Sequence, residues 1–220
     1  MSMARDYDNR ARTAAARETR RRILAVARTS LVDDGYPALR ISTLAAAAGV
    51  SPQTVYNAIG GKAEVLKAVY DVAVVGDDEP VPMSERPEFI RLAEATSPAD
   101  WSSAYAHYTA ELYRRIGHVV GAVLRPGEAL DGGAGQFAET IDRERRIGTT
   151  HAVTALGARL GWPDSAVAPT IDAVWVLNAP EVYDRLVRRS GWSVERYERW
   201  LARQLAACLP PTPGASGDRG

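Results

Sequence analysis

The apolar residues of this chain recur at spacings of three and four, which is the period of an amphipathic α-helix. Ile23, Ala27 and Leu31 form such a stripe, and the two-residue alternation typical of strands is absent throughout. We therefore expect an all-α protein. Outside residues 41–59, helices are expected over residues 13 or 19–34, 62–75, 87–95, 99–124, 135–160, 165–178, 181–190 and 193–209.

Residues 41–59 predict two short helices joined by a tight turn. Ser42 is expected to cap the first, over 43–48, and Ser51 followed by Pro52 to cap the second. Gly49 lies where the chain must turn, and glycine adopts positive φ without strain. The methyl group of Ala45 permits close approach of the second helix. The expected shared core is Leu44, Ala48, Val50, Val55 and Ile59. This spacing favours a helix-turn-helix over an ordinary alanine-rich hairpin.

The second of these helices separates polar from apolar residues when it is drawn with 3.6 residues per turn. Its inner side carries Val55, Ala58 and Ile59. Its outer side carries Gln53, Thr54, Asn57 and, at the edge, Tyr56. Glutamine and asparagine amides can pair bidentately with adenine, and threonine can contact the methyl group of thymine. The alternative is a neutral solvent-exposed face, but surface helices usually carry Glu and Lys for that purpose.

Six motifs follow one another with unbroken spacing between residues 19 and 67: Arg22-Ile23-Leu24, Asp34-Gly35-Tyr36, Ile41-Ser42-Thr43-Leu44-Ala45, Ala48-Gly49-Val50-Ser51, Thr54-Val55-Tyr56 and Gly61-Lys62-Ala63-Glu64-Val65-Leu66. Together they resemble the DNA-binding domain of the TetR (tetracycline-repressor-like) family of bacterial transcriptional regulators. Ile59 departs from the pattern, because the family usually has an aromatic ring there, and a basic or aromatic residue is common near Asn57.

The resemblance implies that Lys62, at the start of the next helix, contacts a phosphate. Backbone N–H groups at a helix N-terminus would assist such a contact. The expected DNA-binding residues are Ser42, Thr43, Ser51, Gln53, Thr54, Tyr56, Asn57 and Lys62. Family membership further implies a repressor, since most members repress.

The charge of the chain is divided unevenly along its 220 residues. Acidic and basic residues number 27 each, yet residues 1–62 hold 10 basic against 5 acidic side chains. A basic N-terminal third on an acidic body is expected when one end of a protein meets phosphate. The single Cys208 excludes an intramolecular disulfide and a cysteine-cluster metal site. No secretory signal or membrane-length apolar run occurs, so we expect a cytoplasmic protein.

We expect three parts in this chain. Residues 1–75 form an N-terminal arm and the helix-turn-helix domain, and residues 76–209 form a helical effector-binding and dimerisation domain. The break between them, at residues 76–82, is rich in turn residues and acid. Residues 210–220 are expected to be disordered because of their proline and glycine content. Residues 1–12 lack apolar periodicity and predict a flexible arm, which either lies along the DNA backbone or stays disordered.

The last two expected helices carry apolar stripes, Val182, Leu186 and Val187 on one and Tyr197, Trp200, Leu201, Leu205, Cys208 and Leu209 on the other. Residues 177–201 resemble the C-terminal end of many TetR-like regulators, in which the last two helices pair with their copies in a four-helix bundle. The resemblance implies a homodimer that binds an inverted-repeat operator. The alternative is that the stripes pack on the rest of the same chain.

The resemblance also implies a pocket for a small-molecule effector inside the body. Its expected lining is Trp101, Tyr105, Tyr108, Phe137 and Trp175, with Asn178 and His151 as polar anchors. An aromatic cavity with few hydrogen-bonding groups suits an apolar or aromatic small molecule. The alternative is that these aromatic side chains are ordinary core.

Catalytic motifs are lacking: the sequence contains neither a nucleophile elbow, a phosphate-binding glycine loop nor a His-Glu-x-x-His pattern. His107, Glu111 and His118 share one side of a helix, but the two histidines are about 16 Å apart along its axis, too far for one metal ion. We therefore expect no enzyme, metal or cofactor. The predicted function is a ligand-responsive DNA-binding repressor, and the alternative is a helical small-molecule-binding protein or enzyme without DNA binding.

Overall fold

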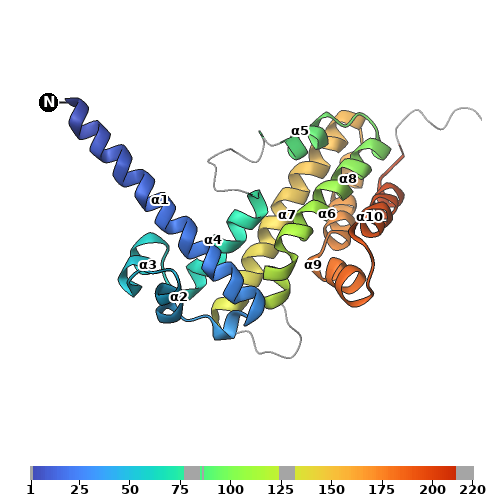
Figure 1. The fold of residues 1–220 in the computed structure, drawn as a ribbon. Coiled ribbons are helices and arrows are strands. Elements are labelled where there is room, and N and C mark those ends of the chain that lie inside the picture. Colours follow the sequence, from blue (N-terminus) through green and yellow to red (C-terminus); the bar gives the residue numbers. More distant parts are fainter. Residues whose placement is uncertain (1, 77–84, 86, 124–131, 212–220) are drawn as a thin grey trace, which may run out of the picture. The chain divides into compact units, whose positions relative to one another are not determined.

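The computed structural model of the chain describes residues 2–76, 85, 87–123 and 132–211 (Figure 1). All regular elements of this part of the chain are helices, as the sequence predicts. Their ends lie close to the expected ones, except at the N-terminus. The tail expected at residues 210–220 lies outside the described residues from 212 onward.

Two compact units make up the chain. The first comprises Met1–Asp78 and His118–Ala138, and the second comprises Glu79–Gly117 and Glu139–Gly220. The break that the sequence indicates after residue 75 lies near the first boundary. Residues 118–138, which the sequence analysis assigned to the effector domain, cluster instead with the N-terminal unit.

The first unit is built on helix α1 (Ser2–Asp33), which packs against α2 (Ile41–Ala47), α3 (Pro52–Ala58) and α4 (Lys62–Val75). A short 3-10 turn, Tyr36–Ala38, follows α1 after Gly35, whose φ is 82°. The core side chains are apolar and less than a tenth exposed: Ile23, Leu24, Ala27, Leu31, Leu44, Ala45, Val55, Val65, Leu66 and Val69. Burial of this size supplies the main driving force for folding the unit.

Helix α1 begins at Ser2, so residues 2–12 are helical rather than a flexible arm. The expectation of an arm relied on the missing apolar stripe, which reports on packing and not on helix formation. Alanine and arginine are strong helix formers, and residues 2–33 contain neither glycine nor proline. Residues 12–18 are exposed on every side of the helix. This segment is therefore a helix that extends beyond the core of its own unit.

The second unit contains α5 (Pro87–Glu94), most of α6 (Pro98–Val123) and α7 (Gly132–Leu160), and α8 (Asp164–Leu177). Helix α9 (Pro180–Tyr183) continues into a π-helical segment, Asp184–Arg189, and α10 (Val194–Cys208) ends the fold. Among the described residues, no helix is long and apolar enough to cross a membrane.

Helix α10 packs against α8, and part of the apolar stripe that the sequence predicts on α10 is buried. Tyr197, Leu201 and Leu205 have no exposed surface in the single chain. Of the two readings of this stripe, the structure therefore supports packing within one chain for these three residues. Trp200 and Cys208 are partly exposed, as are Val182, Leu186 and Val187.

Candidate nucleic-acid interface

Helix α2 begins two residues earlier than the expected start. Its N-cap is Arg40, in extended conformation, and the carbonyl oxygen of Arg40 accepts the first helical bond from the backbone N–H of Leu44, 3.0 Å away. The expected cap, Ser42, lies inside the first turn and is exposed, as is Thr43. The prediction that Ser42 caps α2 was wrong, because the backbone bond from Leu44 fixes the start at Ile41 without any side-chain cap.

Gly49 makes the turn between α2 and α3 with a φ of 65°, as its position predicts. The backbone N–H of Val50 reaches back to the carbonyl oxygen of Ala45 at 3.0 Å, which closes the end of α2. A Cβ atom on Gly49 would meet no atom within 4 Å. Glycine is therefore required by the left-handed backbone conformation and not by lack of space.

Ser51 caps α3, as predicted. Its Oγ accepts a hydrogen bond from the backbone N–H of Thr54 at 3.1 Å and lies 2.8 Å from the Thr54 hydroxyl. Pro52 occupies the first helical position, where a missing N–H costs nothing. The start of α3 is thus fixed by local chemistry that the sequence encodes.

We expect the Ser51→Ala variant to lose about 1 kcal/mol of unfolding free energy, because the backbone N–H of Thr54 loses its side-chain acceptor and keeps only the Ser51 carbonyl oxygen. Ser42→Ala is the matched control, since it removes the same hydroxyl from a position that caps nothing, and it should change stability by less than about 0.5 kcal/mol. Urea denaturation followed by circular dichroism measures both. Equal losses in the two variants would contradict the assignment of the caps.

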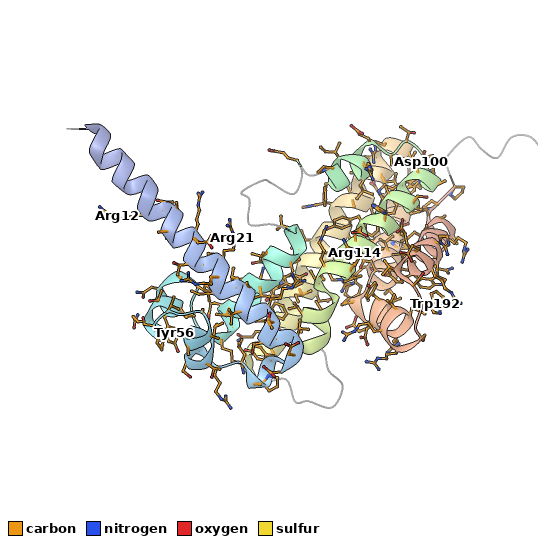
Figure 2. The ribbon with its side chains drawn as sticks, viewed as in Figure 1. Arg12, Arg21, Tyr56, Asp100, Arg114 and Trp192 are labelled. Carbon is orange, nitrogen blue, oxygen red and sulfur yellow. The ribbon has the colours of Figure 1, made fainter. Side chains whose placement is uncertain are left out.

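The outer side of α3 is polar and accessible, whereas Val55 on the inner side is fully buried. Gln53 and Asn57 are exposed, and Tyr56 is 53% exposed (Figure 2). The Gln53 Nε2 donates a hydrogen bond to the Asn57 Oδ1 at 2.9 Å, so the two amides form one unit across a helical turn. Thr54 is half-buried, and its hydroxyl takes part in the cap.

Two arginines of α1 bind the C-terminal ends of α2 and α3, and the sequence did not predict these contacts. Arg20 donates to the carbonyl oxygen of Ala58 at the end of α3, at 3.1 Å. Arg22 donates to the carbonyl oxygen of Ala48 at the end of α2, at 2.9 Å. Cations at helix C-termini satisfy unpaired carbonyls and complement the helix dipole. The run Arg20–Arg22 was visible in the sequence, but its partners lie 38 and 26 residues away.

Lys62 is the first residue of α4, as the sequence resemblance requires. Its Nζ lies 3.4 Å from the carbonyl oxygen of Pro37, to which it donates, and 4.1 Å from the centre of the Tyr36 ring. These contacts hold the ammonium group beside the N-terminus of α4. There its charge adds to that of the unpaired backbone N–H groups, which favours an anion.

The second unit places three of the expected pocket residues on successive turns of α6. The Trp101 ring stacks on that of Tyr105 at 4.8 Å between centres, and Tyr108 meets Tyr105 edge-on at 6.4 Å. Phe89 of α5 adds a further edge-on contact to Tyr108 at 5.8 Å. Trp101 and Tyr105 are buried, whereas Tyr108 is half-buried. Of these three rings, Tyr108 is the one accessible to solvent.

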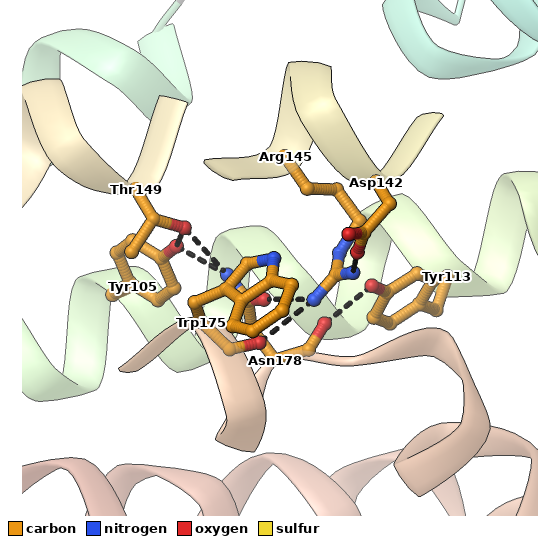
Figure 3. A network of polar contacts seen from close by, with 7 residues as sticks. All are labelled: Tyr105, Tyr113, Asp142, Arg145, Thr149, Trp175 and Asn178. Carbon is orange, nitrogen blue, oxygen red and sulfur yellow. Dashed lines mark hydrogen bonds and ion pairs between the residues drawn. The ribbon is translucent and has the colours of Figure 1, made fainter. Parts of the chain in front are cut away.

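A polar network surrounds the buried Asn178 (Figure 3). The Asn178 Nδ2 donates to the hydroxyl oxygens of Tyr105 and Thr149, the latter at 3.2 Å. Arg145 donates to the Asn178 Oδ1 at 2.8 Å and to the carbonyl oxygen of Trp175 at 2.7 Å. The Tyr113 hydroxyl donates to the backbone carbonyl of Asn178. Asn178 was predicted as a polar anchor, whereas the sequence gave no sign of its partners.

Burial of Tyr105 within this network decides its protonation. Burial raises the pKa of Tyr105, and the hydrogen bonds with Thr149 and Asn178 offset this only in part. Tyr105 therefore stays a neutral hydroxyl. The Arg145 guanidinium pairs with the Asp142 carboxylate, 2.7 Å away.

The other expected pocket residues lie elsewhere. The Trp175 ring has the Arg146 guanidinium over it at 4.9 Å and is half-buried. Phe137 belongs to the first unit, where it meets Tyr70 edge-on at 5.4 Å. His151 is exposed on α7. Within the described residues, the hydrogen-bonded network includes Tyr105, Trp175 and Asn178 but not Phe137 or His151.

The side chains that resembled a metal site in sequence have protein partners in the structure. The His107 Nδ1 lies 3.1 Å from the Glu198 Oε1 of α10. The Arg114 guanidinium beside Glu111, at 2.8 Å, lowers the pKa of that carboxyl. The His118 side chain lies outside the described residues. In the part of the chain that the structure describes, no group of three potential ligands could hold an ion.

Comparison with known proteins assigns the helix-turn-helix. A family model described as "Bacterial regulatory proteins, tetR family" matches residues 23–69. This span runs from the buried half of α1 through α2 and α3 into α4, and so covers the core of the first unit and both helices of the helix-turn-helix. Neither the curated proteins nor the solved structures that were compared include a significant match. The N-terminal domain of the chain is thus similar, over residues 23–69, to that of the tetR family of bacterial regulatory proteins.

Proposed function

We propose that this protein is a DNA-binding transcriptional regulator that inserts α3 into the major groove. The observation that carries the proposal is the outer side of α3, where Gln53, Tyr56 and Asn57 are exposed on a capped helix. Side chains at the start of a recognition helix contact base edges in helix-turn-helix proteins. Ser42, Thr43, Ser51 and Lys62 are proposed to bind the neighbouring phosphates, as hydroxyls and an ammonium group commonly do.

We propose further that the regulator represses and that a small molecule releases it from DNA. The aromatic cluster of Trp101, Tyr105 and Tyr108, next to the polar Asn178, favours an apolar or aromatic effector with one hydrogen-bonding group. Helix α6 carries this cluster on residues of the second unit, and its last residues, from His118, belong to the first. An effector that favours one position of α6 would therefore change the affinity of the N-terminal domain for DNA. The effector must bind the DNA-bound and the released conformations with different affinity, because equal affinity for both leaves their equilibrium unchanged.

Selection from a random-sequence duplex library by the purified protein tests this function. The retained DNA should contain an inverted repeat whose half-site centres are ~34–36 Å apart or a multiple of that distance. Apolar aromatic compounds are then screened for release of the selected duplex in gel-shift experiments. Enrichment of no sequence, with binding equal to that of an unselected duplex, would refute the proposed function. Tyr108→Ala should abolish release by any compound found, while DNA affinity without the compound stays unchanged.

We propose that two copies of the chain assemble through the outer faces of α7 and α8. Ile147 of α7 is 50% exposed and Val176 of α8 is 57% exposed, although both are large and apolar. Both lie close to the Arg146–Asp172 ion pair, 2.6 Å long, which joins these two helices. Two copies that present an exposed apolar face bury it by pairing about a two-fold axis, which an inverted repeat also requires.

We expect Val176→Glu and Ile147→Glu to raise the dimer dissociation constant at least about tenfold, because each places a charge in an apolar contact. Since both side chains are exposed in the single chain, the variants should unfold within about 0.5 kcal/mol of the wild type. Ile90→Glu, at an apolar residue of α5 that is 41% exposed, is the matched control. Analytical ultracentrifugation measures the dissociation constants. If both variants dimerise as tightly as the control, the interface lies elsewhere.

A further inference from the structure

The N-terminal half of α1 carries a dense cluster of positive charge. Residues 12–22, named here the arginine segment, hold five arginines and one acidic residue, Glu18. Arg12, Arg17 and Arg21 are exposed, and Glu18 pairs with Arg21 at 3.1 Å. Both members of that pair are more than 60% exposed, so the ion pair contributes little stability and leaves the surface strongly basic.

The arginine segment ends beside α2 and α3, and its beginning lies farther from them along the axis of α1. Arg20 and Arg22 are fixed to the C-terminal ends of α3 and α2. Arg12 lies eight residues before Arg20, which corresponds to about 12 Å along the helix axis. In Figure 1 the N-terminal part of α1 extends past α2 and α3, and in Figure 2 Arg12 and Arg21 project from it on different sides. The segment therefore presents charge at a fixed distance from α3.

This part of α1 has no apolar surface that another protein helix would bury. Residues 12–18 are exposed throughout, and their apolar members are three alanines. A helix that is polar all round does not gain stability from packing against a core. Its chemistry is instead complementary to a polyanion. If α3 enters the major groove, the nearest polyanion is the sugar–phosphate backbone that flanks the bases read by α3.

We propose that the arginine segment is a second DNA-binding element, in which Arg12 and Arg17 bind backbone phosphates beyond the bases contacted by α3. The inference rests on the proposed function and adds a binding surface outside the matched family domain, which begins at residue 23. A reach of about 12 Å corresponds to the axial rise of three to four base pairs, at about 3.4 Å each. The contacts are electrostatic and carry no base preference.

The double variant Arg12→Gln/Arg17→Gln tests this inference, because glutamine keeps the helix propensity and removes the charge. Two duplexes selected by the wild-type protein serve as probes, one cut at the ends of the inverted repeat and one with about ten extra base pairs on each side. The control is Arg199→Gln/Arg203→Gln, which removes two exposed charges from α10 in the second unit. Circular dichroism establishes that all three proteins are equally helical.

The wild type and the control should bind the longer duplex more tightly than the shorter one. The Arg12→Gln/Arg17→Gln variant should lose that preference, bind the longer duplex roughly tenfold more weakly, and show a salt dependence shallower by about 1.8 per subunit. An unchanged preference and an unchanged salt slope would overturn the inference, as would a change in oligomeric state without a change in DNA binding. Failure of the wild type to bind either duplex would instead refute the proposed function.

Discussion

Replacement of Gln53 or Asn57 by alanine is expected to lower affinity for the cognate DNA by about 1–3 kcal/mol and to relax base preference at the contacted position. Both side chains are exposed on α3, and neither supports the core. The loss should therefore appear in DNA binding and not in stability. Fluorescence anisotropy with the selected duplex and with single-base variants of it measures both affinity and preference.

The hydrogen bond between the two amides adds a second expectation. In the free protein, the Gln53 Nε2 donates to the Asn57 Oδ1 at 2.9 Å, so each amide holds the other in place before DNA arrives. Removal of either one leaves its partner free to rotate, and this loss of preorganisation occurs once, whichever residue is removed. The double variant should consequently lose less affinity than the sum of the two single losses, which a double-mutant cycle detects.

Lys62→Ala is the contrasting variant for these two. Its expected contact is a phosphate, so the change should weaken binding to all sequences alike and make the salt dependence shallower by about 0.9 per subunit. If Lys62→Ala altered base preference, while Gln53→Ala and Asn57→Ala changed nothing, the proposed docking of α3 would be wrong.

Replacement of Asn178 by alanine is expected to lower the unfolding free energy of the second unit by about 2–4 kcal/mol. The change would deprive the Arg145 guanidinium, the Tyr105 hydroxyl and the Thr149 hydroxyl of a shared partner. Buried polar groups that lose a partner pay their full desolvation cost, and the cost is larger for a charged group. The network therefore stabilises the unit through the hydrogen bonds that Asn178 makes with these three groups.

The position of the tryptophans makes this measurement specific to one unit. All five of them lie in the second unit, so tryptophan fluorescence during urea denaturation follows that unit alone. Asn178→Asp should recover part of the loss, because a carboxylate can accept hydrogen bonds from Arg145 and from both hydroxyls. Thr150→Ala, which removes a hydroxyl bonded within α7, is a control expected to cost less than about 1 kcal/mol. A loss for Asn178→Ala no larger than the control's would contradict this account.

The helix-turn-helix could be predicted from sequence because its determinants are local. Ser51, Pro52 and Gly49 act on backbone groups within four residues of themselves, and the structure has all three in their predicted roles. The inner and outer sides of α3 follow from helical periodicity alone. Ser42 shows where such reasoning ends, since a good capping residue does not become a cap when the backbone begins the helix earlier.

The candidate effector site was predictable in part. Helical periodicity brought Trp101, Tyr105 and Tyr108 together, because they follow one another on one side of α6. Periodicity could not supply Thr149 and Arg145, which come from α7 and meet Asn178 across about 30 residues of sequence. Nor could it place Phe137 against Tyr70 in the first unit.

Sequence by itself determined the all-α architecture and the helix-turn-helix of this protein, since both depend on residue spacing within single helices and one turn. Only tertiary structure decided which apolar stripes face the chain's own core. Packing within the second unit buries Tyr197, Leu201 and Leu205, whereas Ile147 and Val176 stay exposed. The tertiary structure also decided the partners of Arg20 and Arg22. A hydrogen bond across 38 or 26 residues depends on how helices cross, and no periodic pattern in the sequence indicates it.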